Sequence, residues 1–223
     1  MKVIVTGATG TVGKAIVQQC LQDEHITTVI ILTRRAVSMD FESHPKVQVV
    51  LHQDFSQYPA EMMRGFEGAE ACLWAIGGRK KMFNHDEDLC RKVNVGYTLA
   101  AADAMLRHLA GKTPDGKKFR FVFCSGGFAE RNLARLLIFH AGVRRIRAEV
   151  ENGLCRLADS NKDKLDVWIL RPGGVVPAHT TIPTKLTRIF GGTIAATQLG
   201  KAMVLFFFTV DCVVIPCQYS FFV

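Results

Sequence analysis

Three glycines near the start of the chain have the spacing and the surroundings of a phosphate-binding turn. Gly7, Gly10 and Gly13 follow the charge-free β-branched run 3–5, and an apolar helical period begins directly after them. The first glycine permits a tight turn, the second lets a pyrophosphate approach the backbone, and the third lets a helix pack against the strand. Unpaired N–H groups at a helix start attract phosphate oxygens. The pattern predicts a nucleotide site, and the alternative is an ordinary glycine-rich turn.

The turn is positioned by the elements around it, and apolar runs alternate with helical patterns along the 223 residues. The alternation predicts a single doubly wound parallel α/β sheet whose ligand crevice lies at the carboxyl ends of the strands. One domain is expected over 1–205, followed by an apolar tail at 206–223. Strands are predicted at 2–6, 28–33, 47–52, 71–76, 119–124 and 166–170, and helices at 12–22, 59–66, 85–109, 132–158 and 197–207.

The segment TGATGTVG at 6–13 is similar to the cofactor loop of the extended and atypical short-chain dehydrogenase/reductases. Over roughly 1–205, the chain resembles the single-domain NAD(P)H-binding, epimerase-like members of that superfamily. The resemblance implies a Rossmann-like fold and a nicotinamide cofactor. It also implies that the cofactor's phosphates contact the residues of the loop, which are Gly7, Thr9, Gly10, Thr11, Val12 and Gly13.

The residues after the second predicted strand bear on the choice of cofactor. A site that prefers NAD(H) places an acid there to accept hydrogen bonds from the ribose 2′-hydroxyl. This chain has Arg34 and Arg35 instead, and guanidinium groups match the geometry of a 2′-phosphate. The sequence therefore favours NADP(H) over NAD(H), and the alternative is a solvated loop.

Further cofactor contacts follow from the resemblance. It implies that Asp54 holds the adenine amino group, although a turn cap would explain an Asp at that position equally well. The small-residue segment Ala75, Ile76 and Gly77 would run beside a ribose, and Asn94 would support the site by hydrogen bonding or only cap its helix. Pro172 and Gly173 resemble the loop that passes the nicotinamide amide, and a Pro-Gly turn is the alternative.

The catalytic residues of the family are only partly present. Ser125 stands at the family's serine position, where its hydroxyl would bind a substrate carbonyl, although serine before two glycines is also plain turn chemistry. The family's acid is a tyrosine four residues before a lysine, and no such pair exists in this chain. Alignment puts Arg147 in the lysine position, where it could hold ribose or a phosphate, and Val143 in the tyrosine position, where no proton can be donated.

Two functions are therefore open. One is hydride transfer to a small carbonyl acceptor by an NADP(H)-dependent oxidoreductase-like protein. The other is a non-catalytic protein that senses NADPH or binds a partner. Residues 175–196 carry no recognisable chemistry, so the sequence names no substrate and no oligomeric state.

The net charge and the cysteine and histidine spacings indicate which ligands to expect. The net charge of +8 lies largely in two basic clusters without a nucleic-acid-binding motif, so a small-molecule ligand is expected and nucleic acid is not. Seven cysteines without paired spacing predict free thiols, and the seven histidines show no metal spacing. Because Met1 leads directly into a strand, no leader is expected and the location is cytoplasmic; the resemblance leaves the mitochondrial outer surface as an alternative.

The tail at 202–223 is nearly continuously apolar, broken by Asp211 and Pro216. A core helix followed by a strand is the first expectation, because an Asp and a Pro weaken a lipid-facing helix. A truncated C-terminus is the second and a membrane anchor the third.

Overall fold

The central sheet of the protein is parallel throughout. The computed structural model describes residues 1–126, 129–130, 141–177, 193–208 and 221–222. Its strand order is β3-β2-β1-β4-β5-β6-β9, and the order reverses between β1 and β4 as in a doubly wound sheet, which confirms the predicted fold class. The strands are β1 (Lys2–Thr6), β2 (Thr28–Thr33), β3 (Val47–Leu51), β4 (Ala69–Trp74), β5 (Phe119–Cys124), β6 (Leu165–Arg171) and β9 (Phe221–Phe222).

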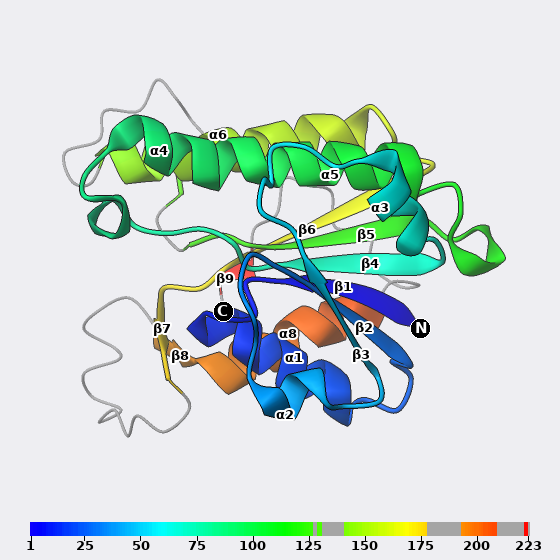
Figure 1. Ribbon diagram of the computed structural model, residues 1–223. Helices are drawn as coiled ribbons and strands as arrows, with labels where there is room; N and C mark the ends of the chain where they lie inside the picture. Colours follow the sequence, from blue (N-terminus) through cyan, green and yellow to red (C-terminus); the bar gives the residue numbers. More distant parts are fainter. Residues whose placement is uncertain (127–128, 131–140, 178–192, 209–220, 223) are drawn as a thin grey trace.

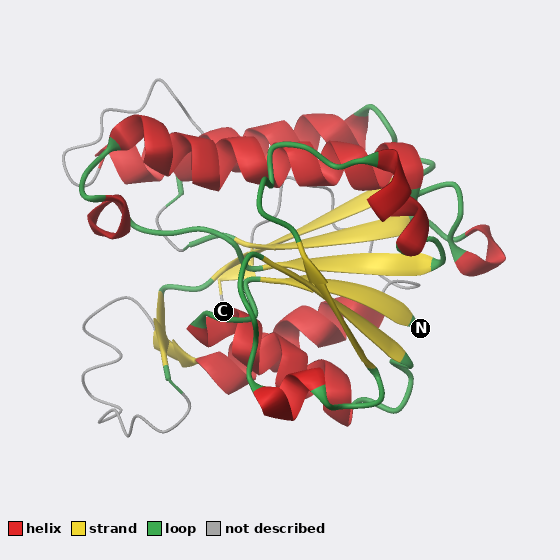
Figure 2. Ribbon diagram, in the orientation of Figure 1, coloured by secondary structure: helices red, strands yellow, loops and turns green. Residues whose placement is uncertain are grey.

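Helices cover both faces of the sheet (Figure 1, Figure 2). On one face lie α3 (Ala60–Gly65), α4 (Glu87–Arg91), α5 (Tyr97–His108) and α6 (Ala141–Asp159). On the other lie α1 (Thr11–Gln22), α2 (Met39–Glu42) and α8 (Ala196–Phe208). Two short strands, β7 (Gly174–Val176) and β8 (Thr193–Ala195), pair beyond the carboxyl end of β6. One-turn segments form η1 (Lys80–Phe83) and η3 (Pro114–Gly116), and η2 (Lys92–Gly96) is a π-helix between α4 and α5.

The apolar strand runs are explained by burial on both faces. Successive side chains of a strand point to opposite faces, so Val3 and Val5 pack with the α1 and α8 layer while Ile4 packs with the α5 and α6 layer. All three are fully buried. A strand covered on both faces has no polar alternation, which is why these runs carry no charge.

Two elements differ from the sequence-based prediction by more than one residue, and the other described boundaries agree with it within one residue. The strand expected at 71–76 is β4, which ends at Trp74 because the N–H of Ala75 donates instead to the Thr6 hydroxyl at 3.2 Å. The helix expected at 85–109 is wrong as one continuous helix. His85 has a positive φ of 64°, helix α4 begins after Asp86, and η2 separates α4 from α5. Of the helix expected at 132–158, residues 132–140 lie outside the described part of the chain.

The apolar tail begins as a core helix. Helix α8 packs along α1, and a Cβ placed on Gly200 would lie 2.8 Å from the Ala15 carbonyl oxygen, so the two backbones are in close contact. Strand β9 pairs with the end of β6. No described helix is long and apolar enough to cross a membrane. Residues 209–220 and 223 of the tail lie outside the described residues.

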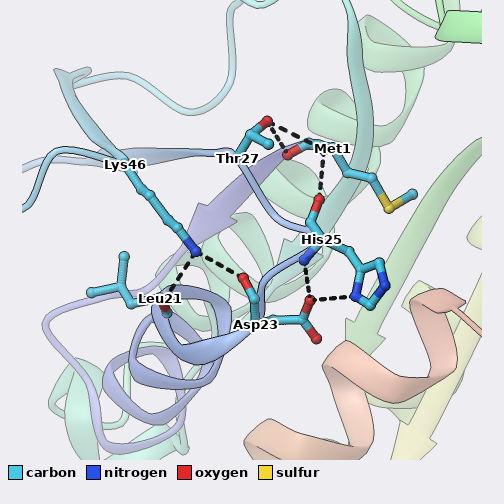
Figure 3. A network of polar contacts seen from close by, with 6 residues as sticks. All are labelled: Met1, Leu21, Asp23, His25, Thr27 and Lys46. Atoms are coloured by element: carbon cyan, nitrogen blue, oxygen red, sulfur yellow. Dashed lines mark hydrogen bonds and ion pairs between the residues drawn. The ribbon is translucent and has the colours of Figure 1, made fainter.

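A polar network fastens the amino-terminal edge of the sheet, away from the carboxyl ends of the strands (Figure 3). The Lys46 ammonium donates to the carbonyl oxygens of Leu21 at 3.3 Å and Asp23 at 2.8 Å, which places a cation at the C-terminal end of α1. The amino group of Met1 donates to the His25 carbonyl at 2.7 Å. These contacts hold α1 against β1 and the start of β3, and so hold the other end of α1 at the crevice.

Candidate cofactor site

The glycine turn has the geometry that its sequence predicts. Gly7 has a φ of +71°, and a Cβ there would lie 2.6 Å from the Ala75 carbonyl oxygen. A Cβ on Gly13 would lie 2.0 Å from the Gly7 carbonyl oxygen, so α1 starts directly against the end of β1. The N–H of Gly10 donates to the Gly7 carbonyl at 2.8 Å and closes the turn.

The first turn of α1 offers its N–H groups without competition from acidic side chains. Gly10 is the N-cap, no side chain caps the helix, and the first turn contains no acid. Thr9, Gly10 and Thr11 are exposed, whereas Val12 packs partly against the core. The positive end of a twelve-residue helix therefore faces the carboxyl end of β1.

A cavity of about 380 Å³ opens beside this turn, a volume typical of small-molecule sites. Among its lining residues, those predicted from the sequence are Gly7, Thr9, Gly10, Arg34, Arg35, Ala75, Ile76 and Gly77. Thr33 and an apolar wall were not predicted from the sequence, and that wall consists of Leu32, Phe55, Met82, Phe83, Val93 and Tyr97. Thr11, Val12, Gly13, Asp54, Arg147, Pro172 and Gly173 do not line it.

Arg34 and Arg35 stand on a turn whose backbone is fixed from two sides. The Thr33 hydroxyl donates to the Arg35 carbonyl at 2.9 Å, and the Gln53 amide donates to the Arg34 carbonyl at 3.0 Å. Both arginines are exposed at the edge of the cavity. None of the described residues that line the cavity is acidic, so nothing there repels a phosphate.

Asp54 is occupied as a turn cap. Its exposed carboxylate accepts hydrogen bonds from the Ser56 hydroxyl at 2.6 Å and the Ser56 N–H at 3.0 Å, and these bonds lower the pKa of Asp54. The next residue, Phe55, is buried against Trp74 and Tyr97 and forms a wall of the cavity. An adenine contact by Asp54 stays a prediction.

Asn94 ties the segment after β4 to the π-helix. Its Oδ1 accepts the Gly78 N–H at 3.0 Å, and its Nδ2 donates to the carbonyl oxygens of Gly78 at 3.2 Å and Cys90 at 2.7 Å. π-helical turns are rare and are frequent at functional sites. Asn94 therefore bonds to its own helix and also fixes the backbone beside the cavity. The sequence leaves these two roles as alternatives, and the side chain makes both kinds of contact.

Ser125 belongs to a partly buried network at the carboxyl ends of β5 and β6. Its hydroxyl donates to the Glu151 carboxylate at 2.6 Å, and the Arg171 Nε donates to the same oxygen at 2.9 Å. A second Arg171 nitrogen pairs with the other Glu151 oxygen. Glu151 is fully buried. Because a serine has one hydroxyl proton, this arrangement leaves Ser125 with only lone pairs to offer a ligand.

A role for Glu151 was not predicted from the sequence. Its position four residues after Arg147 on an otherwise apolar helix face was the available signal, together with Arg171 at the end of a strand. Only the packing of α6 against β6 brings the two side chains together.

Arg147 lies on α6 against the backbone after β5. Its Nη1 is 2.0 Å from the position that a Cβ on Gly126 would take, so glycine is needed there. Burial lowers the pKa of Arg147, while the Cys124 thiol and the Glu151 carboxylate act in the opposite direction and the positive charge of Arg79 adds to the effect of burial. Pro172 is buried and Gly173 partly buried between β6 and β7, at the same end of the sheet.

No described tyrosine stands beside Arg147 on α6. Val143 occupies the position one helical turn earlier. Tyr58 and Tyr97 pack around Phe55 instead, and burial raises the pKa of Tyr58. Tyr219 lies outside the described residues. The described part of α6 therefore carries a cation at Arg147 and no phenol one turn before it, and the correspondence of Arg147 with the family's lysine stays a prediction.

Comparison with known proteins agrees with this geometry. An NAD(P)H-binding family model matches residues 7–207. The chain is 30% identical over 125 residues to Leucinostatins biosynthesis cluster protein T of Purpureocillium lilacinum, a match that covers 56% of this chain and 42% of that protein. The chain thus matches less than half the length of that relative.

Solved structures share the fold at low sequence identity. Yeast methylglyoxal/isovaleraldehyde reductase Gre2, complexed with NADPH, superposes with a TM-score of 0.72 at 14% identity over 100% of this chain and 78% of the other. MoeE5 in complex with UDP-glucuronic acid and NAD gives 0.69 at 14% identity, over 100% and 75%. With a glycine turn, a doubly wound sheet and a family model that spans most of its length, the chain belongs to the NAD(P)H-binding family.

Proposed function

We propose that this protein binds NADP(H) in preference to NAD(H). The observation that carries the proposal is the Arg34-Arg35 turn, which lines the cavity at the end of β2 where an NAD(H) site has an acid. Both guanidinium groups are exposed, and Thr33 and Gln53 fix the backbone that presents them. A 2′-phosphate on the adenosine ribose would gain charge-assisted, bidentate hydrogen bonds there.

The described residues fit the rest of such a cofactor. The pyrophosphate would lie at the first turn of α1, where Gly10 has no side chain and a Cβ would meet only the Gly7 carbonyl oxygen, at 3.3 Å. Adenosine would contact the apolar wall formed by Phe55 and Val93, beside Ala75, Ile76 and Gly77. The nicotinamide would lie toward Pro172 and Gly173 and supply or accept a hydride.

The reaction that fits this arrangement is hydride transfer to a small carbonyl compound, without the family's proton donor. Val143 cannot donate a proton, and Ser125 has committed its proton to Glu151. These two observations favour a second candidate, a cofactor-binding protein that does not reduce carbonyls. Both candidates require the same cofactor site.

The cofactor preference is tested by titrating the purified protein with NADPH and NADH. Trp74 directly precedes Ala75 of the cavity wall, so its emission, which overlaps the absorption of reduced nicotinamide, reports binding of either cofactor. We expect NADPH to bind about tenfold more tightly or better, because one charge-assisted hydrogen bond contributes about 1.5–3 kcal/mol. Arg34→Ala with Arg35→Ala should remove the difference and leave NADH affinity unchanged. Equal affinities in the natural protein would contradict the proposal.

Catalysis is tested separately by single-turnover oxidation of bound NADPH with a panel of small aldehydes and ketones. Oxidation above the rate without protein supports the oxidoreductase, and its absence with intact NADPH binding supports the cofactor-binding protein.

A further inference from the structure

The guanidinium of Arg147 is not bonded to any carboxylate of the described residues, whereas several cations near it are. Four of the basic side chains near it are paired with carboxylates. These pairs are Lys80 with Glu87 at 2.8 Å, Arg91 with Glu149 at 2.6 Å, Arg144 with Glu130 at 3.9 Å, and Arg171 with Glu151. Within the part of the chain that the structure describes, Arg147 forms neither an ion pair nor a hydrogen bond.

The surroundings of Arg147 compensate its charge only in part, because the Cys124 thiol and the Glu151 carboxylate favour the charged form while burial and Arg79 oppose it. The side chain lies against Gly126, and burial disfavours its charged form. The carboxylate nearest in sequence on the same helix face, Glu151, is already bonded to Arg171 and Ser125. Arg79, on the connection after β4, adds a second positive charge. One buried carboxylate, Glu151, thus faces two guanidinium groups, and a partly buried cation compensated only in part is costly, so this point of the fold favours an external anion.

Arg147 lies at the edge of the sheet formed by the carboxyl ends of the strands. Figure 1 shows the carboxyl end of β5, the first half of α6 and the connection between β4 and α4 together at this edge. Ser125 and Gly126 directly follow β5 there. Arg147 does not line the cavity that contains Arg34 and Arg35, so its anion is distinct from a 2′-phosphate in that cavity.

We infer that Arg147, assisted by Arg79, binds the carboxylate of a small ligand that lies beside the nicotinamide. The inference rests on the proposed function, because that function assigns the cofactor's phosphates to α1 and to the Arg34-Arg35 turn. A planar guanidinium pairs with a carboxylate through two parallel hydrogen bonds, whereas the point charge of a lysine would not impose that geometry. The substrate class is therefore a small oxo acid or hydroxy acid. Ser125, with lone pairs free, would accept a hydrogen bond from the ligand.

The test uses oxamate and oxamide, two small probes of nearly the same shape of which only oxamate carries a carboxylate. Each is titrated calorimetrically into the natural protein, with and without saturating NADPH. Oxamate should bind about tenfold more tightly than oxamide or better, as expected for a charge-assisted pair. Arg147→Gln should remove that difference, Arg147→Lys should restore part of it, and the exposed Arg145→Gln on the same helix should leave it intact.

The outcomes separate this inference from the proposed function. Equal binding of oxamate and oxamide by the natural protein would overturn the inference, whether or not a variant folds. An Arg147→Gln protein that loses NADPH affinity as strongly as oxamate affinity would also overturn it, because the anion would then belong to the cofactor. Carboxylate-selective binding in a protein that does not bind NADPH would retain the anion site and overturn the proposed function.

Discussion

At the scale of single residues, the buried Glu151 carries the strongest energetic consequence. Its carboxylate holds the Arg171 guanidinium and the Ser125 hydroxyl together between α6 and the sheet. Glu151→Gln removes the charge that compensates a largely buried arginine, and breaking such a pair costs about 3–5 kcal/mol. We expect the free energy of unfolding, measured in urea, to fall by about that amount. Glu149→Gln on the same helix is the control, because its pair with Arg91 is solvent-exposed and contributes about 0–1 kcal/mol. Equal effects of the two substitutions would show that the network is not structural.

Gly10 and Gly13 are adjacent glycines of one motif, yet the structure gives them different roles. A Cβ on Gly10 meets only the Gly7 carbonyl at 3.3 Å, whereas a Cβ on Gly13 would lie 2.0 Å from it. Gly10→Val should therefore abolish NADPH binding with little loss of stability, because the side chain takes the space of the pyrophosphate. Gly13→Ala should destabilise the fold itself by driving α1 away from β1. Calorimetric NADPH titrations and thermal unfolding of both variants check this, and unchanged binding by Gly10→Val would mean that the loop is only a turn.

At the scale of elements, α6 places Val143 and Arg147 one turn apart on the same helix face. The double substitution Val143→Tyr with Arg147→Lys restores the donor and the cation at the family's spacing. If the remaining site is competent, NADPH-dependent carbonyl reduction should rise by about 10²–10⁴-fold, the usual contribution of a positioned acid. Arg147→Lys alone is the control and should give no increase. A double variant that binds NADPH normally and stays inert would favour the cofactor-binding protein.

At the scale of the whole molecule, the sheet and its two helical layers bury ionisable thiols whose protons are linked to folding. Burial raises the pKa of Cys20 to about 12, from 9.0 for an exposed thiol, and raises that of Cys72 as well. The folded protein holds these protons more tightly than the unfolded chain does. The free energy of unfolding is therefore unaffected by these thiols below about pH 9, where both states keep the protons. It falls as the pH rises from there toward 12, by at most about 1.4 kcal/mol per pH unit for each thiol. Urea unfolding between pH 8 and 10.5 measures the slope, and Cys20→Ala should reduce it. An unchanged slope in Cys20→Ala would refute the assignment to this thiol.

Local patterns were sufficient to predict most of the fold. The strand runs are continuous and apolar because the parallel sheet is covered on both faces, and such runs are visible in a single sequence. The boundaries after β4 were not predictable, because Ala75 leaves the ladder to bond with the Thr6 hydroxyl, 69 residues earlier in the chain. The interruption by η2 likewise depends on Asn94, which bonds to Gly78 across a loop.

The sequence by itself determined the glycine turn between β1 and α1 and the absence of an acid after β2. Both depend only on the types of residues that are adjacent in the chain. The tertiary structure decided which distant groups meet. Because Glu151 is buried away from water, its carboxylate needs partners within the protein, and Arg171 and Ser125 provide them. The same packing sets Arg147 against Gly126, near a Glu151 carboxylate that is bonded to Arg171 and Ser125 instead. No spacing along the chain encodes these contacts, because they arise only when α6 is placed on β5 and β6.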